Sequence, residues 1–396
     1  MSQVVSSGGR PFGRSMRAPV FYGLALGSTA PLALVAVFLP GVLGGLRASA
    51  TLAGVVGAAA FLGPLLVWRR YAAEIASAGG LYAYVERAAG TNVARVHGAI
   101  WIVSYFLYLP STVSQVAYAV LPSAYPAMGG LRPALELVIP AALVVGLAFW
   151  RLGLYAVTAL VGVALVVVTV VVAAVELAHS GTGSAGIGLH VPAVTAGNGA
   201  AAASLLFVCA SLPLYFGAEL ERATARTRRG LSVAFAVAAG ALVVGALALV
   251  NLPPALLGGE VPGATAVGVF AGRGLADVVV LAAAASLLVL VLLEYVAITR
   301  LLTVMTPLRP RSSEAVVGGT FLLSCALSLL GPDGAYEQLL EPSLVALYLS
   351  LLVVFVVYPR WRARERRLDA ADVVATALAT ALMLYGVLAT LVPSAV

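Results

Sequence analysis

Lysine is absent from this 396-residue chain, and cysteine and histidine are scarce. The two cysteines, Cys209 and Cys325, both lie inside apolar stretches, so the sequence has no disulfide framework and no metal-ligand spacing. The three histidines form no cluster with carboxylates, and no nucleophile elbow, zinc-protease or phosphate-loop motif occurs. The sequence therefore predicts no cofactor, no bound metal and no enzyme activity.

Charged residues make up only 10% of the chain, whereas hydrophobic residues make up 62% and the mean hydropathy is +1.04. Such a composition indicates a polytopic membrane protein and excludes an ordinary soluble domain. A helix needs about 20 apolar residues to cross roughly 30 Å of hydrocarbon. By that criterion the sequence predicts eleven segments, at residues 18–39, 48–67, 97–121, 134–150, 152–177, 200–218, 231–251, 275–302, 315–330, 343–358 and 370–392.

Arginine sets the expected orientation, because cytoplasmic loops of membrane proteins carry the excess of basic residues. With the N-terminus in the cytoplasm, only Arg47, Arg132 and Arg273 fall outside, and 20 of the 23 arginines lie inside. An odd number of segments then places the C-terminus outside. The net charge of +7 is interpreted as a topology signal and an attraction to anionic membrane lipids, with no nucleic-acid partner. We therefore expect a multi-pass protein of the cytoplasmic membrane.

The first segment differs from a secretory signal peptide, although arginines precede it and residues 48–50 resemble a cleavage site. Its apolar stretch is longer than the about 7 to 15 residues of a signal core. We therefore expect it to remain in the protein as the first transmembrane helix.

Two apolar segments contain a break at the same relative position. In the first segment the run from Gly27 to Ala30 leads to Pro31, and in the sixth the run from Cys209 to Leu212 leads to Pro213. Proline cannot donate to the carbonyl one turn back, and lipid offers no replacement hydrogen bond. Breaks at matching positions of two halves indicate the substrate site of a secondary transporter. The alternative is that both prolines only kink packed helices.

The segments are organised as one integral domain with two halves of five. Five spans per half invert the second half relative to the first, as in inverted-repeat transporters. The predicted fold is all-α and integral to the membrane, with eleven transmembrane helices, a five-plus-five inverted repeat and discontinuous helices 1 and 6. Its expected parts are a cytoplasmic N-terminal tail (1–17), a first repeat (18–177), an extracytoplasmic loop (178–199), a second repeat (200–358), and a basic loop with an additional helix 11 (359–396).

The loop after the second segment carries a recognisable pattern. It reads Ala73-Glu74, then Ala78-Gly79-Gly80-Leu81-Tyr82-Ala83-Tyr84, then Arg87-Ala88-Ala89-Gly90. This string resembles the Ala-Glu, Ala-Gly-Gly-x-Tyr-x-Tyr and Arg-x-x-Gly pattern of the amino acid, polyamine and organocation (APC) permeases. The glycines permit a tight reversal, and the two tyrosines are suited to anchoring a short helix in the membrane interface.

Three other regions resemble the same family, so the resemblance spans residues 18 to about 360. They are the glycine-containing break at residues 27–29, the acidic pair Glu219 and Glu221 before a basic loop, and the basic exit of the tenth segment. The sequence departs from the family in its sixth helix, where a Gly-Phe-Glu-like run corresponds to residues 210–212 without the acid. The family's Asn-Pro after that helix is Ala-Thr here, and the loop proline before Ala-Gly-Gly is missing. These departures bear on substrate class more than on fold.

Unwound helix ends expose N–H groups on one half-helix and carbonyl groups on the other, so the main chain can hold an anion and a cation together. An amino acid zwitterion fits this arrangement, with its carboxylate near the N–H groups of residues 28–30 and its ammonium near carbonyls around Leu26, Cys209 and Ala210. The resemblance implies the same layout. The absence of a carboxylate there favours a neutral amino acid or amine. The predicted substrate-binding residues are Leu26, Gly27, Ser28, Thr29, Ala30, Tyr105, Tyr108, Cys209, Ala210, Ser211, Leu212 and Tyr215.

Glu294 is the proton-coupling candidate, because a carboxylate inside a membrane segment marks a proton site by default. The alternative is a salt bridge, or snorkelling near the cytoplasmic face. Sodium in related folds is held partly by hydroxyls of helix 8, which offers only Ser286 at depth. Glu136 is expected to pair with Arg132 four residues earlier. Glu219 is expected to form a solvated ion pair at the inner face.

These features together predict a secondary active permease for amino acids or related small amines, driven by protons, with alternating access around a site at mid-membrane. The alternative from another class is a non-transporting membrane scaffold or sensor that keeps the permease architecture. The missing acid in the sixth segment and the scarcity of ion ligands favour that alternative.

Overall fold

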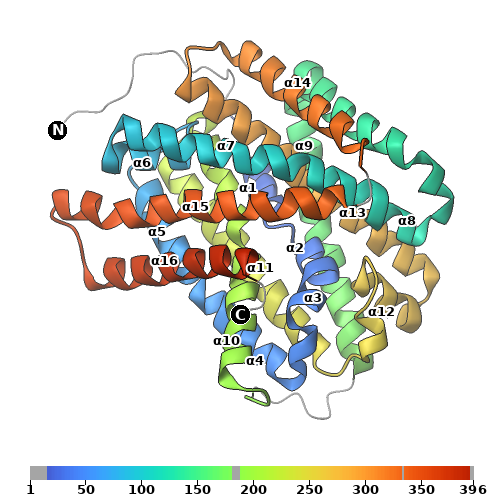
Figure 1. The fold of residues 1–396 in the computed structure, drawn as a ribbon. Helices are drawn as coiled ribbons and strands as arrows, with labels where there is room; N and C mark the ends of the chain where they lie inside the picture. Colours follow the sequence, from blue (N-terminus) through green and yellow to red (C-terminus); the bar gives the residue numbers. More distant parts are fainter. Residues whose placement is uncertain (1–15, 181–187, 332–333, 393–396) are drawn as a thin grey trace.

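A computed structural model describes residues 16–180, 188–331 and 334–392. These residues form helices and connecting loops (Figure 1). The α-helices are α1 (Ala18–Gly27), α2 (Pro31–Ala33), α3 (Leu39–Leu43), α4 (Ala50–Ala60), α5 (Leu62–Ala72), α6 (Leu81–Ala89), α7 (Thr91–Ser114), α8 (Leu121–Ala124), α9 (Arg132–Ser180), α10 (Ala193–Leu205), α11 (Ala223–Leu249), α12 (Pro262–Ala271), α13 (Arg273–Met305), α14 (Pro310–Ser328), α15 (Ala335–Arg364) and α16 (Ala370–Leu391).

Tighter or wider helical turns interrupt this series at six places. They are the π-helices η1 (Leu34–Phe38) and η3 (Gln115–Val120) and the 3-10 helices η2 (Gly44–Ser49), η4 (Pro126–Leu131), η5 (Val208–Glu219) and η6 (Pro254–Leu256). Most are short, but η5 is 12 residues long, and 3-10 runs longer than about 4 residues are uncommon. Such a stretch marks a strained or functional position in the fold.

Eight helices in the described part of the chain are long and apolar enough to cross a membrane, which supports a multi-pass membrane protein. Two of them, Ala18–Ala72 and Pro126–His179, each contain two of the expected segments. The ninth expected segment lies in α14, which is not among the eight. The count of eleven crossings therefore stays a prediction.

Several helix ends differ from the expected ones. The expected extracytoplasmic loop at 178–199 is partly helical, because α9 continues to Ser180 and α10 already begins at Ala193. Expected segments 134–150 and 152–177 form the single element α9, bent at Trp150, whose backbone dihedrals are −137° and 36°. The expected N-terminal tail at 1–17 lies outside the described residues except for Met16 and Arg17.

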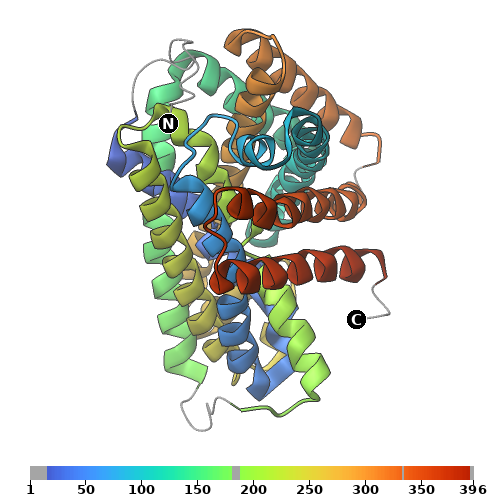
Figure 2. The same ribbon diagram turned by 90° about the vertical axis from the view of Figure 1, so that its left-hand side faces the viewer.

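Two sets of helices run in different directions and pack across one another. In Figure 1, α7, α15 and α16 lie almost parallel to each other, and Figure 2 shows α9 and α11 running nearly at right angles to α15 and α16. Helix α15 packs against both α7 and α16, and α1 packs against α9 and α11. The packing of α1 on α9 is close, because a Cβ added at Gly162 would lie 2.5 Å from the carbonyl oxygen of Gly23. Helix α1 is also packed against α13 and η5, so neighbouring elements surround it.

Loops that the arginine pattern assigns to one side of the membrane do meet in the structure. Arg70 contacts Asp369 at 3.1 Å, Arg87 contacts Glu365 at 3.0 Å, and Arg151 forms an ion pair with Glu314. Each pair joins two loops from the predicted cytoplasmic set. At the other side, the N–H group of His190 donates to Ser49 Oγ at 2.7 Å, which joins the predicted outer loop at 178–199 to the outer end of the second predicted segment. The assignment of one side to the cytoplasm stays a prediction.

The short helix expected after the Gly79-Gly80 reversal is present as α6, and Gly80 has a positive φ of 50°. Its tyrosines, however, do not anchor it in a lipid interface. Tyr84 stacks on Tyr71 with ring centroids 4.6 Å apart, and Tyr71 also stacks on Trp361 at 4.5 Å. The aromatic rings therefore fasten α6 to the protein interior, because tertiary packing offers a better partner than lipid headgroups.

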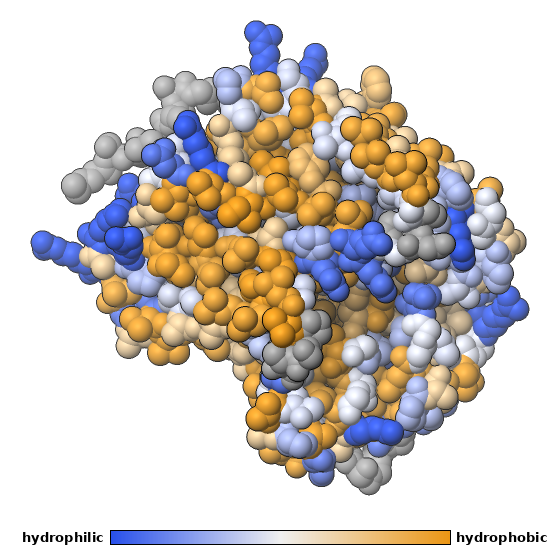
Figure 3. Space-filling view, in the orientation of Figure 1, coloured by the Kyte–Doolittle hydropathy of each residue, from blue (hydrophilic) through white to orange (hydrophobic). Residues whose placement is uncertain are grey.

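The protein surface is largely apolar, as expected for lipid contact. In Figure 3 hydrophobic residues cover most of the visible face, and hydrophilic residues gather in separate clusters. Many large apolar side chains are exposed, including Leu160 at 71% and Val170 at 63% on α9. Exposure on this scale is a liability in water and is favourable in hydrocarbon.

Candidate functional site

The first broken helix separates at the position expected from its sequence. Helix α1 ends at Gly27, Ala30 adopts a left-handed conformation (φ 41°, ψ 54°), and α2 begins with Pro31. The hydroxyl of Ser28 donates to the carbonyl of Ala25 at 2.8 Å. The small residues therefore turn the chain, and proline starts the next helical piece, where its missing N–H group is not needed.

The N–H groups of this break are not free, which corrects one part of the sequence interpretation. All three donate to the preceding turn: Ser28 to the carbonyl of Leu24 (2.9 Å), Thr29 to Leu26 (3.2 Å) and Ala30 to Gly27 (3.0 Å). The N–H group of Ala33, in α2, points across to Ser286 Oγ on α13 at 3.5 Å. The helix ends thus satisfy these donors within the protein, because tight turns and a neighbouring hydroxyl replace the lost α-helical bonds.

The second broken helix separates earlier than its sequence indicates. Helix α10 ends at Leu205, the chain turns through Leu206 and Phe207, and η5 continues to Glu219. Pro213 lies inside η5 and not at the end of an unwound run. The expected break at residues 209–213 was therefore displaced, because i to i+3 bonds such as Ala210 N–H to the Phe207 carbonyl (2.9 Å) keep this stretch helical.

A cavity of about 320 Å³ lies between the two breaks. Of the predicted site residues it brings together Ser28, Thr29, Ala30, Tyr108 and Cys209. The remaining lining residues are mainly aliphatic or aromatic, and none carries a formal charge: Leu34, Phe38, Val42, Ala202, Leu205, Leu206, Val208, Leu290, Tyr336, Leu340, Leu344, Leu347, Tyr348, Tyr385, Gly386, Ala389 and Thr390. Hydroxyls, a thiol and tyrosine rings thus face an otherwise apolar space.

The other predicted site residues lie next to this cavity or away from it. Those that do not line it are Leu26, Gly27, Tyr105, Ala210, Ser211, Leu212 and Tyr215. Tyr215 packs on Trp101 with ring centroids 4.7 Å apart, and Trp101 packs on Tyr105 at 4.3 Å. These aromatic side chains pack η5 against α7. Their contact with a substrate stays a prediction.

Sequence reasoning missed the wall that α15 and α16 provide. Tyr336, Tyr348 and Tyr385 line the cavity from these helices, and Leu290 lines it from α13. The Tyr385 hydroxyl also donates to the Asn198 carbonyl at 3.0 Å, which ties α16 to α10. No local pattern signals this wall, because it depends on how the C-terminal helices pack across the rest of the chain.

Glu294 lies beside the second break and is fully buried. The thiol of Cys209 donates to one carboxylate oxygen across 4.0 Å, and the other oxygen has no hydrogen-bond partner in the described residues. Leu290, one turn earlier on α13, lines the cavity. Within the described chain Glu294 forms no ion pair, and its role as a proton site stays a prediction.

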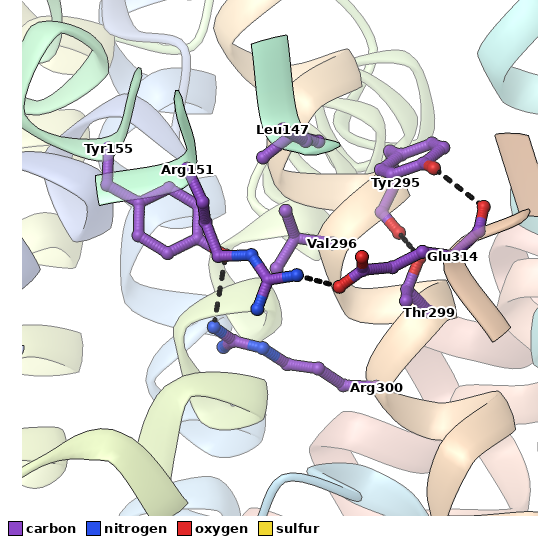
Figure 4. A pocket seen from close by; sticks show the side chains of 8 residues that line it. All are labelled: Leu147, Arg151, Tyr155, Tyr295, Val296, Thr299, Arg300 and Glu314. Carbon is purple, nitrogen blue, oxygen red and sulfur yellow. Dashed lines mark hydrogen bonds and ion pairs between the residues drawn. The ribbon is translucent and has the colours of Figure 1, made fainter. Parts of the chain in front are cut away.

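A second polar cluster, around Arg300, contacts the C-terminal part of η5. Arg300 forms an ion pair with Glu219, and its guanidinium also donates to the carbonyl of Tyr215 at 2.9 Å and to the hydroxyl of Tyr155 at 3.3 Å. The Glu219 side chain is only 8% exposed, which corrects the expectation of a solvated pair. Figure 4 shows Arg300 extending toward Tyr155, while Arg151 reaches Glu314 on the other side of the same small pocket.

Glu136 also differs from its expected role. It does not pair with Arg132; instead the hydroxyls of Ser114 and Ser328 both donate to the same carboxylate oxygen, Oε1, at 2.7 Å. The Glu136 side chain is fully buried, whereas the guanidinium of Arg132 lies 5.9 Å from the ring centroid of Tyr118. The spacing of four residues allowed an ion pair between Glu136 and Arg132, but Glu136 accepts hydrogen bonds from serines on α7 and α14 in its place.

Comparisons with solved structures place this geometry in a known architecture. The manganese transporter of Eremococcus coleocola, in complex with an aromatic bis-isothiourea substituted compound, matches with a TM-score of 0.62 and 14% identity, over 94% of this chain and 86% of that one. A variant of the same transporter matches with a TM-score of 0.65 over the same shares. Mhp1, a nucleobase-cation-symport-1 family transporter, matches with a TM-score of 0.62 and 13% identity, over 94% of this chain and 90% of that one.

No protein-family model and no curated protein matches the sequence. The structural similarities confirm the expected fold class, the all-α fold of APC-type transporters with discontinuous helices 1 and 6. Membership of the APC family itself stays a prediction.

Proposed function

We propose that this chain is a secondary active transporter, and not an enzyme, for a neutral amino acid or a related small amine. One observation carries the proposal: two breaks, 176 residues apart when counted from Ala30 to Leu206, contribute to the same cavity. Irregular backbone at membrane depth is tolerated where it lines a cavity, and paired broken helices are the usual site of substrate binding in such folds.

The fold of the protein supports transport but does not identify the substrate. The side chains that line the cavity are the evidence for the substrate class. The solved neighbours carry manganese in one case and belong to a nucleobase-cation symport family in the other, so one architecture serves unlike substrates. The cavity of about 320 Å³ is large enough for a small organic solute. Its lining has no charged side chain, so a substrate with a net charge would lose hydration without a counter-charge.

Polar groups in the lining fit a solute with a short polar end and an apolar body. Ser28, Thr29 and Cys209 supply hydroxyl and thiol groups at the two breaks, and the tyrosines of α15 and α16 supply aromatic faces opposite them. The described residues contain no group of three or more His, Cys, Asp or Glu side chains placed to hold a metal ion. We therefore propose an organic substrate, although one solved neighbour is a manganese transporter.

Glu294 is the proposed proton site. Its carboxylate is buried, faces the thiol of Cys209 at the second break, and belongs to the same helix as the cavity residue Leu290. A carboxylate in this position is stable when it carries a proton and unstable when it is charged, unless a change of conformation admits water or a partner. Loading and release of that proton would couple transport to a proton gradient.

The decisive test uses purified protein in proteoliposomes that contain an imposed pH gradient. A mixture of radiolabelled neutral amino acids and amines is offered, and we expect accumulation of at least one compound that stops when the gradient is dissipated. Glu294→Gln should retain binding and exchange but lose gradient-driven accumulation. Glu176→Gln, at another buried carboxylate outside the cavity, is the matched control and should accumulate substrate normally.

The alternative function is a non-transporting scaffold or sensor with permease architecture. The departures from the family pattern in the sixth segment favour it. If no compound accumulates or exchanges in vesicles that contain folded protein, transport is excluded for the compounds offered and the scaffold is favoured. Full pH-driven accumulation by Glu294→Gln would contradict the proposed proton site but would leave the proposed transport function intact.

A further inference from the structure

A groove of about 960 Å³ lies on the surface where the bend of α9 meets the start of α14. Transport as proposed above makes no use of it. The groove lies at the arginine-rich end of the protein, since Arg151 and Glu314 join its two sides. It is lined by Leu147, Ala148, Phe149, Trp150, Arg151, Leu152, Gly153, Arg309, Pro310, Arg311, Ser312 and Glu314.

One side of the groove is apolar and strongly exposed. Phe149 is 86% exposed and Trp150 is 59% exposed, and both lie at the bend inside α9. The indole of Trp150 lies directly against Gly153, because a Cβ at that glycine would lie 2.0 Å from the ring. Exposed tryptophan side chains are typical of the membrane–water interface, where the apolar body of the ring meets lipid and the N–H group meets water.

The other side of the groove is positively charged. Arg309 and Arg311 are exposed, and neither forms an ion pair within the described chain, whereas Glu314 is already paired with Arg151. Both arginines lie at the N-terminus of α14, a helix of 19 residues whose first turn has no side-chain cap. The unpaired N–H groups and dipole of that helix end add to the attraction for an anion.

We propose that this groove binds the headgroup of an anionic phospholipid. The phosphate lies at the start of α14 between Arg309 and Arg311, and the glycerol and acyl chains pass over Trp150 and Phe149. Charge alone would suit a soluble phosphate as well. The exposed aromatic residues beside the arginines favour the lipid, because a phospholipid carries acyl chains next to its phosphate and inorganic phosphate has none.

Trp150 supplies a direct probe of this site. The chain has four tryptophans, and the other three, Trp68, Trp101 and Trp361, are at most 1% exposed. Lipids brominated on their acyl chains quench tryptophan on contact. The full-length protein is reconstituted in mixtures where either phosphatidylglycerol or phosphatidylcholine carries the bromine. We expect stronger quenching by brominated phosphatidylglycerol at equal mole fraction, and we expect this difference to disappear in Trp150→Phe.

Variants identify the charges responsible. In the double variant Arg309→Gln with Arg311→Gln, the two brominated lipids should quench tryptophan equally. The control double variant, Arg228→Gln with Arg229→Gln, should still be quenched more strongly by brominated phosphatidylglycerol. The control pair is also exposed and free of ion pairs among the described residues, but it lies on α11 outside the groove. Soluble inorganic phosphate should not reduce the preference.

Each of the following results would overturn the proposal. They are equal quenching of the wild type by both lipids, a preference that survives Trp150→Phe, and a preference that inorganic phosphate abolishes. Loss of the preference in the control pair as well would show a general attraction to basic residues and no site at the groove. Thermal unfolding of each variant, compared with wild type, verifies that the exposed substitutions leave the fold intact.

Discussion

Arg300 and Glu219 form an ion pair inside the protein, with side-chain exposures of 2% and 8%. The pair ties α13 to the last residue of η5, the 12-residue helix that follows the second helix break. Arg300 is further held by the Phe216 ring, whose centroid is 3.9 Å from the guanidinium carbon. The second broken segment is thus fixed at its polar end by one charge from the neighbouring helix, and that dependence can be measured.

Removing one partner of this pair should destabilise the protein strongly. In Glu219→Gln the guanidinium of Arg300 stays buried without its counter-charge, and breaking such a pair is expected to reduce the free energy of unfolding by about 3 to 5 kcal/mol. Denaturant unfolding in detergent micelles measures the effect. Glu221→Gln is the control, since Glu221 is 65% exposed in its pair with Arg226 and should change stability by less than about 1 kcal/mol. Equal effects of the two variants would contradict the structural role of Arg300.

Replacing Ala30 with glycine should stabilise the folded protein. Its left-handed backbone (φ 41°) costs an alanine about 1 kcal/mol or more, whereas glycine adopts it freely. We expect Ala30→Gly to raise the unfolding temperature slightly and Ala30→Val, with a branched Cβ, to lower it. A thermal unfolding series of the two variants and wild type tests the order. Ala30→Val as stable as wild type would contradict the break at this residue.

Cys209 should react with thiol reagents while Cys325 should not. Cys209 lines the cavity and is partly exposed, whereas Cys325 is fully buried. Mass spectrometry after treatment with a small methanethiosulfonate is expected to find one modified cysteine, and Cys209→Ser should abolish the modification. A transported substrate should slow the reaction. Modification of Cys325 at the same rate would show that the cavity does not control access.

The start of α16 should weaken at low pH. Asp369 accepts the N–H group of Asp372, which lowers its pKa below the usual 3.8, and Arg70 lowers the pKa further. A lowered pKa means that the carboxylate stabilises the fold above pH 3.8 and loses this effect as the pH falls through the depressed value. Wild type should therefore lose stability below about pH 4 relative to Asp369→Asn, which keeps an N-cap acceptor without a charge. Thermal unfolding across pH 3 to 6 measures the difference, and parallel pH curves would contradict it.

The two helix breaks show how far local sequence predicts backbone. The first break was located correctly, because the small residues before Pro31 and the proline itself act within one turn of the chain. The second was displaced to Leu206 and Phe207, although Pro213 suggested a later position. Its 3-10 turns keep hydrogen bonds around the proline, and they are held in place by contacts with α13 and α11 that adjacent residues do not reveal.

The acidic residues show the same limit for side chains. Spacing along a helix predicted a pair between Glu136 and Arg132, yet Ser114 and Ser328 provide closer partners from other helices. Glu219 was expected in solvent and lies buried against Arg300. In both cases the partner comes from a distant part of the chain, so no periodicity in the sequence could identify it.

The sequence by itself determined that this is a polytopic membrane protein with interrupted first and sixth segments, because hydropathy and proline act locally and along the chain. The distribution of arginine also predicts which loops share one side of the bilayer, and the contacts of Arg70 with Asp369 and of Arg87 with Glu365 agree with that prediction. Only the tertiary structure decided which side chains line the cavity, which carboxylates are buried and where the basic groove forms. Those features arise where helices far apart in sequence cross, and the crossing depends on shape complementarity over whole surfaces, such as Gly162 against Gly23.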